Sequence, residues 1–129
     1  MVVDSSALLA VLLQEPDAAA MSLALKQGHP RRLSAANFVE TSMVLEARHA
    51  DAGIRELDTL LQRASIEIIS IDEQQARIAR EAFRHFGKGR HKAGLNFGDC
   101  FAYALAKSLD EPLLCKGEDF CLTDISVVL

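Results

Sequence analysis

Cysteine is scarce in this chain of 129 residues, which contains only Cys100, Cys115 and Cys121. Their number is odd and none of them forms a Cys-x-x-Cys pair, so the sequence indicates neither a disulfide framework nor a zinc site. We expect three small core residues in a reducing compartment.

Long apolar runs are missing as well. No stretch approaches the roughly 20 apolar residues that a membrane-spanning helix needs. The apolar run at residues 7–13 has no basic segment before it, and Asp4 and Glu15 flank it too closely for a secretory signal peptide. The sequence therefore predicts a cytoplasmic protein.

The signatures of several enzyme classes are absent too. The Gly-Lys-Gly at residues 87–89 lacks the spacing of a phosphate-binding P-loop, and no Gly-x-Ser-x-Gly or Cys-His nucleophile arrangement is visible. The formal net charge of −4 argues against a general nucleic-acid binder. A bound cation would, however, cancel acids that gather at a metal site, so net charge decides little.

The chain does have enough apolar residues for a core. Half of its residues are hydrophobic, and a domain of this length buries roughly 68% of the surface that its unfolded chain exposes. We expect a single domain over residues 1–129, with no linker. Strand and helix patterns alternate along the chain, which predicts an α/β fold with a mainly parallel sheet covered on both faces.

The expected elements follow from these patterns. The expected strands lie at residues 1–4, 32–35, 66–71, 112–115 and 126–129. Ser5 or Ser6 is expected to cap the first helix. Further helices are expected from residue 16 to about 26, from Asn37 to about 49, from Gly53 to about 64, over 72–87 and over 96–109.

Four acids stand where a strand should end or a helix should begin: Asp4, Glu40, Asp99 and Asp119. In an open α/β sheet, strand ends and helix N-termini converge on one edge, so we expect these carboxylates to share a pocket. Clustered carboxylates repel one another unless a cation joins them. Mg²⁺ prefers carboxylate and water oxygens, which favours metal-assisted phosphoryl chemistry.

Two of these acids also have a purely structural interpretation. Asn37 with Glu40, and Asn96 with Asp99, have the spacing of a capping box, which stabilises a helix end by about 1 kcal/mol. Such a cap places the carboxylate in the first helical turn, so capping and metal binding are compatible.

The support for a functional role differs between the other two acids. Asp4 follows a buried apolar strand, where a charge is seldom kept without a partner, so its interpretation is functional. The functional interpretation of Asp119 is weaker, because residues 118–120 are also consistent with the start of a helical turn.

A glycine-rich basic segment at residues 87–94 comes immediately before Asp99. We expect a mobile loop whose positive tip contacts the phosphates of a polyanion; the alternative is a solvated loop without a partner. The candidate side chains are Lys88, Arg90, His91 and Lys92.

Several motifs follow one another along essentially the whole chain. They are Val3-Asp4-Ser5-Ser6-Ala7-Leu8, Asn37-Phe38-Val39-Glu40-Thr41, Leu95-Asn96-Phe97-Gly98-Asp99-Cys100, and Pro112-Leu113-Leu114-Cys115-Lys116-Gly117-Glu118-Asp119-Phe120 with Thr123-Asp124-Ile125. This ordered set resembles the PIN-domain ribonucleases, and most closely the VapC toxins of bacterial toxin-antitoxin pairs. Each motif alone is weak, whereas their order is specific.

The resemblance implies a three-layer α/β/α sandwich around a sheet of about five strands. It implies an endoribonuclease toxin that uses Mg²⁺ or Mn²⁺ to hydrolyse RNA, with tRNA or ribosomal RNA as substrate. Asp4 and Asp99 match the principal metal ligands of the family, and Glu40 matches an acid that assists directly or through water.

The fourth acid is less well defined by the resemblance. Asp119 approximates it, but many family members carry an Asp where this chain has Gly117. The role is therefore open between Asp119, Glu118 and neither of them. Lys116, beside this segment, is a further candidate RNA contact.

The resemblance also implies partners: a homodimer, and a VapB antitoxin whose C-terminal tail blocks the site. The apolar segment 37–64 is the expected dimer surface. Two other functions stay open. A phosphatase with an aspartyl nucleophile would need a second Asp where Ser6 stands, and a non-enzymatic module of the same fold would bind RNA or a protein without metal.

Overall fold

The chain folds around a parallel sheet of four strands in the order β3-β2-β1-β4, which confirms the α/β prediction. The computed structural model describes residues 1–129. Its strands are β1 (Val2–Val3), β2 (Arg31–Ser34), β3 (Ile66–Ile69) and β4 (Leu113–Leu114). Its helices are α1 (Ser5–Leu12), α2 (Ala18–Gln27), α3 (Ala35–Arg63), α4 (Glu73–Phe86), α5 (Phe97–Leu109) and the 3-10 helix η1 (Asp119–Leu122).

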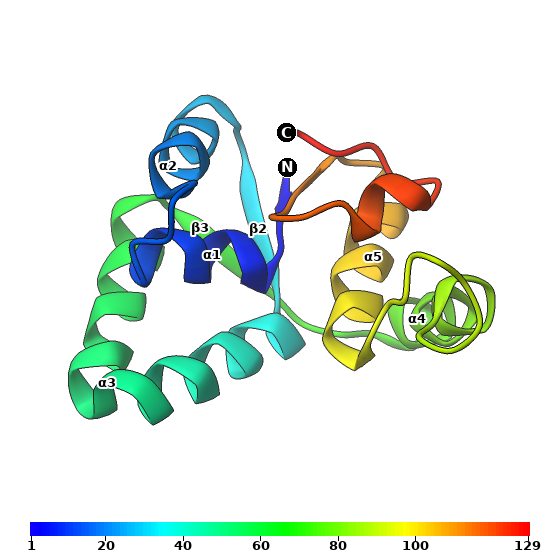
Figure 1. The fold of residues 1–129 in the computed structure, drawn as a ribbon, viewed down its shortest axis with the longest axis horizontal. Helices are drawn as coiled ribbons and strands as arrows, with labels where there is room; N and C mark the ends of the chain where they lie inside the picture. The colour runs from blue at the N-terminus through cyan, green and yellow to red at the C-terminus, as the bar shows by residue number, and fades with distance from the viewer.

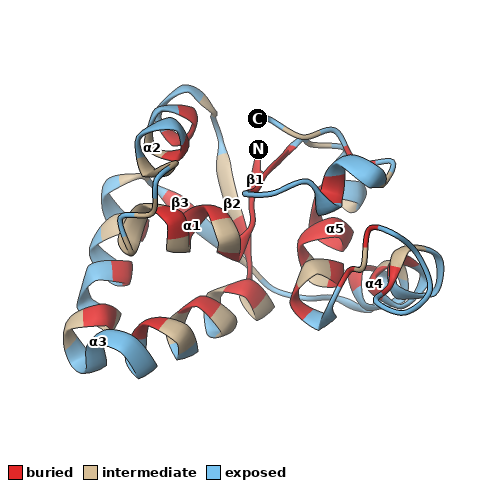
Figure 2. Cartoon of the chain, viewed as in Figure 1, coloured by how far each residue is buried: buried red, intermediate tan, exposed pale blue.

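The central strands are buried on both faces. Because successive side chains of a strand point to opposite faces, Val2 packs in the apolar cluster beneath α4 and α5, whereas Val3 packs in the cluster beneath α1, α2 and α3. Leu113 and Leu114 divide in the same way. Figure 1 shows the two groups of helices on opposite sides of the sheet, and Figure 2 shows the buried residues facing it. The arrangement is the expected three-layer sandwich.

The segment expected as a fifth strand is reduced to a single bridge. Val127 pairs in parallel with Leu113, through hydrogen bonds of 2.9 Å from Leu113 N to the Ser126 carbonyl and from Val128 N to the Leu113 carbonyl. Since β4 itself has only two residues, the pairing extends no further, and the sheet has four strands rather than about five.

Two helices begin earlier than the sequence suggested. Asp4, and not Ser5 or Ser6, is the N-cap of α1, because its carboxylate accepts the Ser6 backbone N–H. Ser34 at the end of β2 caps α3, so Asn37 lies within the first turn of that helix instead of starting it. In both cases the last residue of a strand also supplies the cap of the next helix.

The two helices expected between residues 37 and 64 form one bent element, α3. Its backbone turns sharply at Ala50, where φ is 52° and ψ is −139°. Gly53 makes this bend possible, since a Cβ there would lie 2.4 Å from the Leu45 carbonyl oxygen. Figure 1 shows the two halves of α3 diverging from this point.

The cysteines are free, as predicted, but only Cys100 and Cys115 are buried, and Cys121 is exposed on η1. The expectation of three core cysteines is therefore wrong for Cys121, whose helix is covered only through Phe120. None of the helices is long and apolar enough to cross a membrane.

Candidate metal centre

The fold brings the four acids to one edge of the sheet. Asp4 follows β1, where its N–H donates to the Leu114 carbonyl at 2.9 Å, and Asp99 lies in the first turn of α5. The charges of Asp99 and Glu40 both help to raise the pKa of Asp4, and the charge of Asp119 helps to raise the pKa of Asp99. The charges of these carboxylates therefore act on one another at this edge of the sheet.

Asp4 is the most deeply buried of the four, with 3% of its surface exposed. Its Oδ2 accepts two hydrogen bonds from Ser6, from the backbone N–H at 3.0 Å and from the hydroxyl at 2.6 Å. Its Oδ1 is buried without any hydrogen-bond partner. Burial raises the pKa of Asp4 to about 6, although the bonds from Ser6 oppose this rise.

Ser6 also holds the neighbouring strand end. Its hydroxyl donates to Asp4 and accepts the backbone N–H of Lys116 at 2.9 Å. One side chain therefore ties the end of β1 to the segment after β4. Through the bond from the Ser6 N–H, Asp4 also caps α1. The sequence did not indicate this structural role of Asp4.

Glu40 is held between three residues. Its Oε1 accepts the Ser5 hydroxyl at 2.6 Å and the Asn37 amide at 3.4 Å. On its other side lies Gly98, where a Cβ would come within 2.2 Å of Glu40 Oε2. Asn37 is fully buried and donates a second bond to the Gly98 carbonyl at 3.0 Å, which fixes α3 against the start of α5.

The capping predictions have different outcomes at the two Asn residues. Asn96 and Asp99 form the predicted box: Asp99 N–H donates to Asn96 Oδ1 at 2.9 Å, and Asn96 N–H donates to Asp99 Oδ2 at 3.0 Å. Asn37 does not cap a helix, because Ser34 already accepts the first free N–H of α3. Burial raises the pKa of Asp99, with a further contribution from the charge of Glu40 and an opposing effect of the bond from Asn96.

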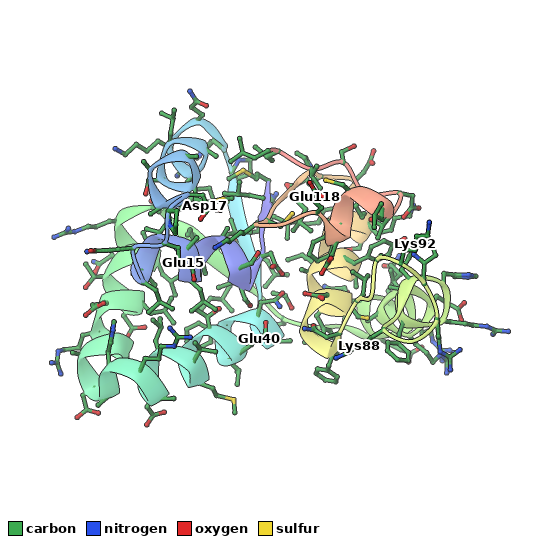
Figure 3. The ribbon with its side chains drawn as sticks, in the orientation of Figure 1. Glu15, Asp17, Glu40, Lys88, Lys92 and Glu118 are labelled. Atoms are coloured by element: carbon green, nitrogen blue, oxygen red, sulfur yellow. The ribbon has the colours of Figure 1, made fainter.

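Asp119 begins η1 and is exposed. Its charge contributes to the raised pKa of both Asp99 and Cys115, so it lies near the centre. Glu118 precedes η1 and is also exposed, and Figure 3 shows it apart from Glu40.

The four acids fit a hard divalent ion better than zinc. In their present positions no three Asp, Glu, His or Cys side chains converge closely enough to hold one ion. Mg²⁺ does not need such a cage, because it is usually bound by one or two carboxylates together with waters and substrate phosphates. The unpartnered Asp4 Oδ1 is a suitable oxygen donor. Burial raises the pKa of the Cys115 thiol to about 12.

The basic candidates occupy two different environments. Lys88, Arg90, His91 and Lys92 are exposed on the segment between α4 and α5. Lys116 is already engaged, because its Nζ lies 2.7 Å from Glu15 Oε1 and 3.5 Å from Asp17 Oδ1. Figure 3 shows these two acids on the side of α1 and α2, away from the basic loop.

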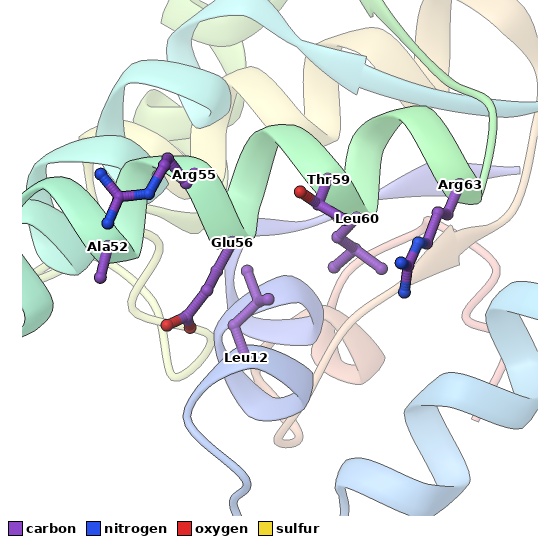
Figure 4. Close-up of a pocket in the computed structure, with 7 residues that line it drawn as sticks. All are labelled: Leu12, Ala52, Arg55, Glu56, Thr59, Leu60 and Arg63. Atoms are coloured by element: carbon purple, nitrogen blue, oxygen red, sulfur yellow. The ribbon is translucent and has the colours of Figure 1, made fainter.

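A separate hollow contains none of the four acids. It has a volume of about 520 Å³ and lies between the end of α1 and the second half of α3, with Leu12, Arg55 and Leu60 in its wall. Figure 4 shows these side chains around the opening. The hollow contributes nothing to the metal centre.

Sequence reasoning missed the residues that hold the acids in place. Ser5, Ser6, Asn37 and Gly98 all contact a carboxylate or fix its neighbour, yet each is a common residue in turns and caps. Their proximity in sequence to an acid was the available signal: two serines follow Asp4, and Gly98 precedes Asp99.

Comparison with known proteins identifies the family of this chain. Residues 1–125 match the family model described as PIN domain. The chain is 52% identical to Ribonuclease VapC30 of Mycobacterium tuberculosis over 128 residues, which cover 99% of this chain and 98% of the relative.

Solved structures with the same fold are more distant in sequence. VapC20 of Mycobacterium tuberculosis, described as a sarcin-ricin loop cleaving toxin, has a TM-score of 0.80 at 14% identity, covering 98% of this chain and 97% of that one. VapBC2 from Rickettsia felis, bound to a DNA fragment from its promoter, has a TM-score of 0.73 at 15% identity, with coverages of 98% and 95%.

Proposed function

This chain belongs to the VapC ribonuclease toxins of the PIN-domain family, and from that premise we propose that it cleaves RNA with a divalent metal ion bound at its acidic edge, chiefly by Asp4 and Asp99. The observation that carries the proposal is Asp4 Oδ1, a carboxylate oxygen that is buried without a partner near the charges of Asp99 and Glu40. A buried anion of this kind is costly unless a cation balances it.

We assign the roles as follows. Asp4 and Asp99 are the principal metal ligands. Glu40, which Ser5 and Asn37 hold by hydrogen bonds, assists them directly or through water, and Asp119 is the fourth acid of the site. Mg²⁺, or Mn²⁺ in its place, would supply Lewis-acid activation of water and charge neutralisation at the scissile phosphate.

The protein's own residues prepare the site in two ways. Ser6 donates two hydrogen bonds to Asp4 Oδ2 and leaves Oδ1 without a partner, so the orientation of the carboxylate is fixed. Asp4 and Asp99 must be ionised to bind a cation, and their raised pKa values make this dependent on pH. No side-chain nucleophile is needed, and burial keeps the Cys100 thiol neutral by raising its pKa to about 11.

Substrate, partners and location complete the proposal. The substrate is tRNA or ribosomal RNA, in keeping with the description of VapC20 as a sarcin-ricin loop cleaving toxin. We propose that the chain acts in the cytoplasm as a single PIN domain, that it forms a homodimer, and that a VapB-type antitoxin neutralises it, as the VapBC2 complex suggests.

The test is cleavage of total tRNA and ribosomal RNA by the purified protein with Mg²⁺, with Mn²⁺ and with EDTA. Cutting should require the metal and be lost in Asp99→Asn. Cutting that survives in this variant would contradict the assignment of Asp99. RNA binding that ignores the metal, without any cleavage, would instead support the non-enzymatic alternative.

A further inference from the structure

A largely apolar groove of about 510 Å³ lies between α4 and α5. Phe83, Phe97 and Phe101 line it together with Cys100, and Arg80 is the one charged residue in its wall. Phe97 is 75% exposed and Phe83 is 40% exposed, so two aromatic rings face solvent across the groove. The Phe97 ring also contacts that of Phe101, with 4.9 Å between their centroids.

The exposure of Phe97 has no explanation in the core. It lies on the same face of α5 as Phe101 and the fully buried Leu105, yet Phe97 in the first turn is exposed. Phe97 and Asp99 both lie in the first turn of α5, so the groove and the acids share this end of the helix.

The segment that forms the α4 wall of the groove is basic. Residues 73–94, which comprise α4 and the following loop, contain six Lys or Arg against two Glu, a local charge of +4 in a chain of net charge −4. The Arg90 guanidinium lies 5.4 Å from the centre of the Phe83 ring, which brings a cation to the aromatic wall. A second copy docking through the same face would bring two such surfaces together, so charge favours an anionic occupant.

We propose that this groove binds an unpaired RNA nucleotide next to the scissile phosphate, with its base stacked on Phe97 and its phosphates held by Arg80 and Arg90. The proposal rests on the ribonuclease function given above and adds a base-binding subsite to it. Proteins that bind single-stranded nucleic acid combine a cationic groove with exposed aromatic rings in this way. Tyr103 is not available for stacking, because it is buried and donates its hydroxyl to Asp124 at 2.6 Å.

The test is the affinity of the full chain for a fluorescein-labelled single-stranded RNA 12-mer, measured by anisotropy in EDTA so that no cleavage occurs. Phe97→Ala should weaken binding by about 5-fold to 150-fold, the range for loss of one base–aromatic stack. The matched control is Leu23→Ala, which removes a side chain of 56% exposure from α2, and it should leave the affinity unchanged.

Salt dependence separates stacking from phosphate contacts. Arg80→Ala should lower the slope of log affinity against log salt concentration by about 0.7, the value for one phosphate contact on a single strand, whereas Phe97→Ala should not change it. Arg55→Ala, on α3 and away from the groove, is the control for a lost positive charge. Equal slopes for the two Arg variants would overturn the phosphate contact.

An RNA series with one abasic position at a time distinguishes a base from a protein partner. At one position, loss of the base should make Phe97→Ala nearly silent, because both changes remove the same stack. If Phe97→Ala changes the sedimenting mass of the protein but weakens intact and abasic RNA equally, the groove is a protein interface and the proposal is wrong. Binding that depends on Phe97 without any metal-dependent cleavage would overturn the ribonuclease function and leave the groove assignment intact.

Discussion

Asp4→Asn should stabilise the metal-free protein at neutral pH while abolishing cleavage. Asn retains the cap of α1, since its side-chain oxygen can still accept the bonds from Ser6 while its amide occupies the place of Oδ1. The substitution removes the buried charge and places an amide NH₂ where Oδ1 stood, so the charge accounts for an upper bound on the gain. A functional residue that lowers stability in this way is the expected cost of a site prepared for a cation.

The magnitude follows from the pKa of Asp4, which burial raises from 3.8 to about 6. A rise of roughly two units, at 1.36 kcal/mol each, sets an upper bound of about 3 kcal/mol for the stability that ionisation of Asp4 costs. That free energy corresponds to a rise in Tm on the order of 10 °C for a domain of this size.

The pH dependence has a definite sign. Below pH 3.8 Asp4 is protonated in both the folded and the unfolded chain, so ionisation costs nothing. As the pH rises from 3.8 to about 6, only the unfolded chain has fully released this proton, and the wild-type protein loses stability. The advantage of Asp4→Asn should therefore grow through this window and stay constant above it.

The assay is urea unfolding of both proteins in EDTA at pH 4, 5, 6 and 7, with Asp58→Asn as an exposed control on α3. Adding Mg²⁺ at pH 7 should stabilise the wild-type protein and not Asp4→Asn, because only the former binds the ion in its folded state. If Asp4→Asn is less stable than the wild-type protein at pH 7, or if their difference in unfolding free energy does not change with pH, the ionised Asp4 is not what destabilises the metal-free protein.

Two further predictions concern the residues that hold the acids. Gly98→Ala should reduce cleavage about 10-fold to 100-fold without lowering Tm. Its Cβ would displace the end of the Glu40 side chain, whereas Ala favours a helix more than Gly does. Unchanged cleavage would contradict the role given to the position of Glu40. Ser6→Ala should cost about 1–3 kcal/mol in urea unfolding and weaken Mn²⁺ binding, because Asp4 loses a buried hydrogen bond. The control is Ser108→Ala, because the Ser108 hydroxyl donates only to a carbonyl of its own helix. An equal loss of stability and of Mn²⁺ affinity in this variant would contradict the role of Ser6.

The positions of several of the candidate acids could be predicted because they depend on local rules. A carboxylate directly after an apolar strand marks Asp4, and the spacing of Asn96 and Asp99 marks a capping box that the structure contains. The topology of a parallel sheet then brings such residues to one edge. Neither step requires knowledge of how the helices pack.

The parts that escaped prediction depend on packing between elements. Asn37 has the spacing of a cap, but a serine at the end of β2 fills that role and leaves Asn37 to join α3 to α5. Phe97 lies on the same face of α5 as the buried Leu105, yet spacing along a helix cannot show that its ring is exposed. The bend at Ala50 was placed only as a break between two helices, because its geometry depends on contact between Leu45 and Gly53.

The assignment of Asp4 and Asp99 as metal ligands is tested by binding of Mn²⁺ to the purified protein, followed by electron paramagnetic resonance at pH 7 in the absence of RNA. We predict that the wild-type protein binds Mn²⁺ and that Mg²⁺ competes for the same site. Both Asp4→Asn and Asp99→Asn should lose the bound ion while remaining folded. Mn²⁺ binding of equal strength in wild type and both variants would show that these carboxylates do not form the metal centre.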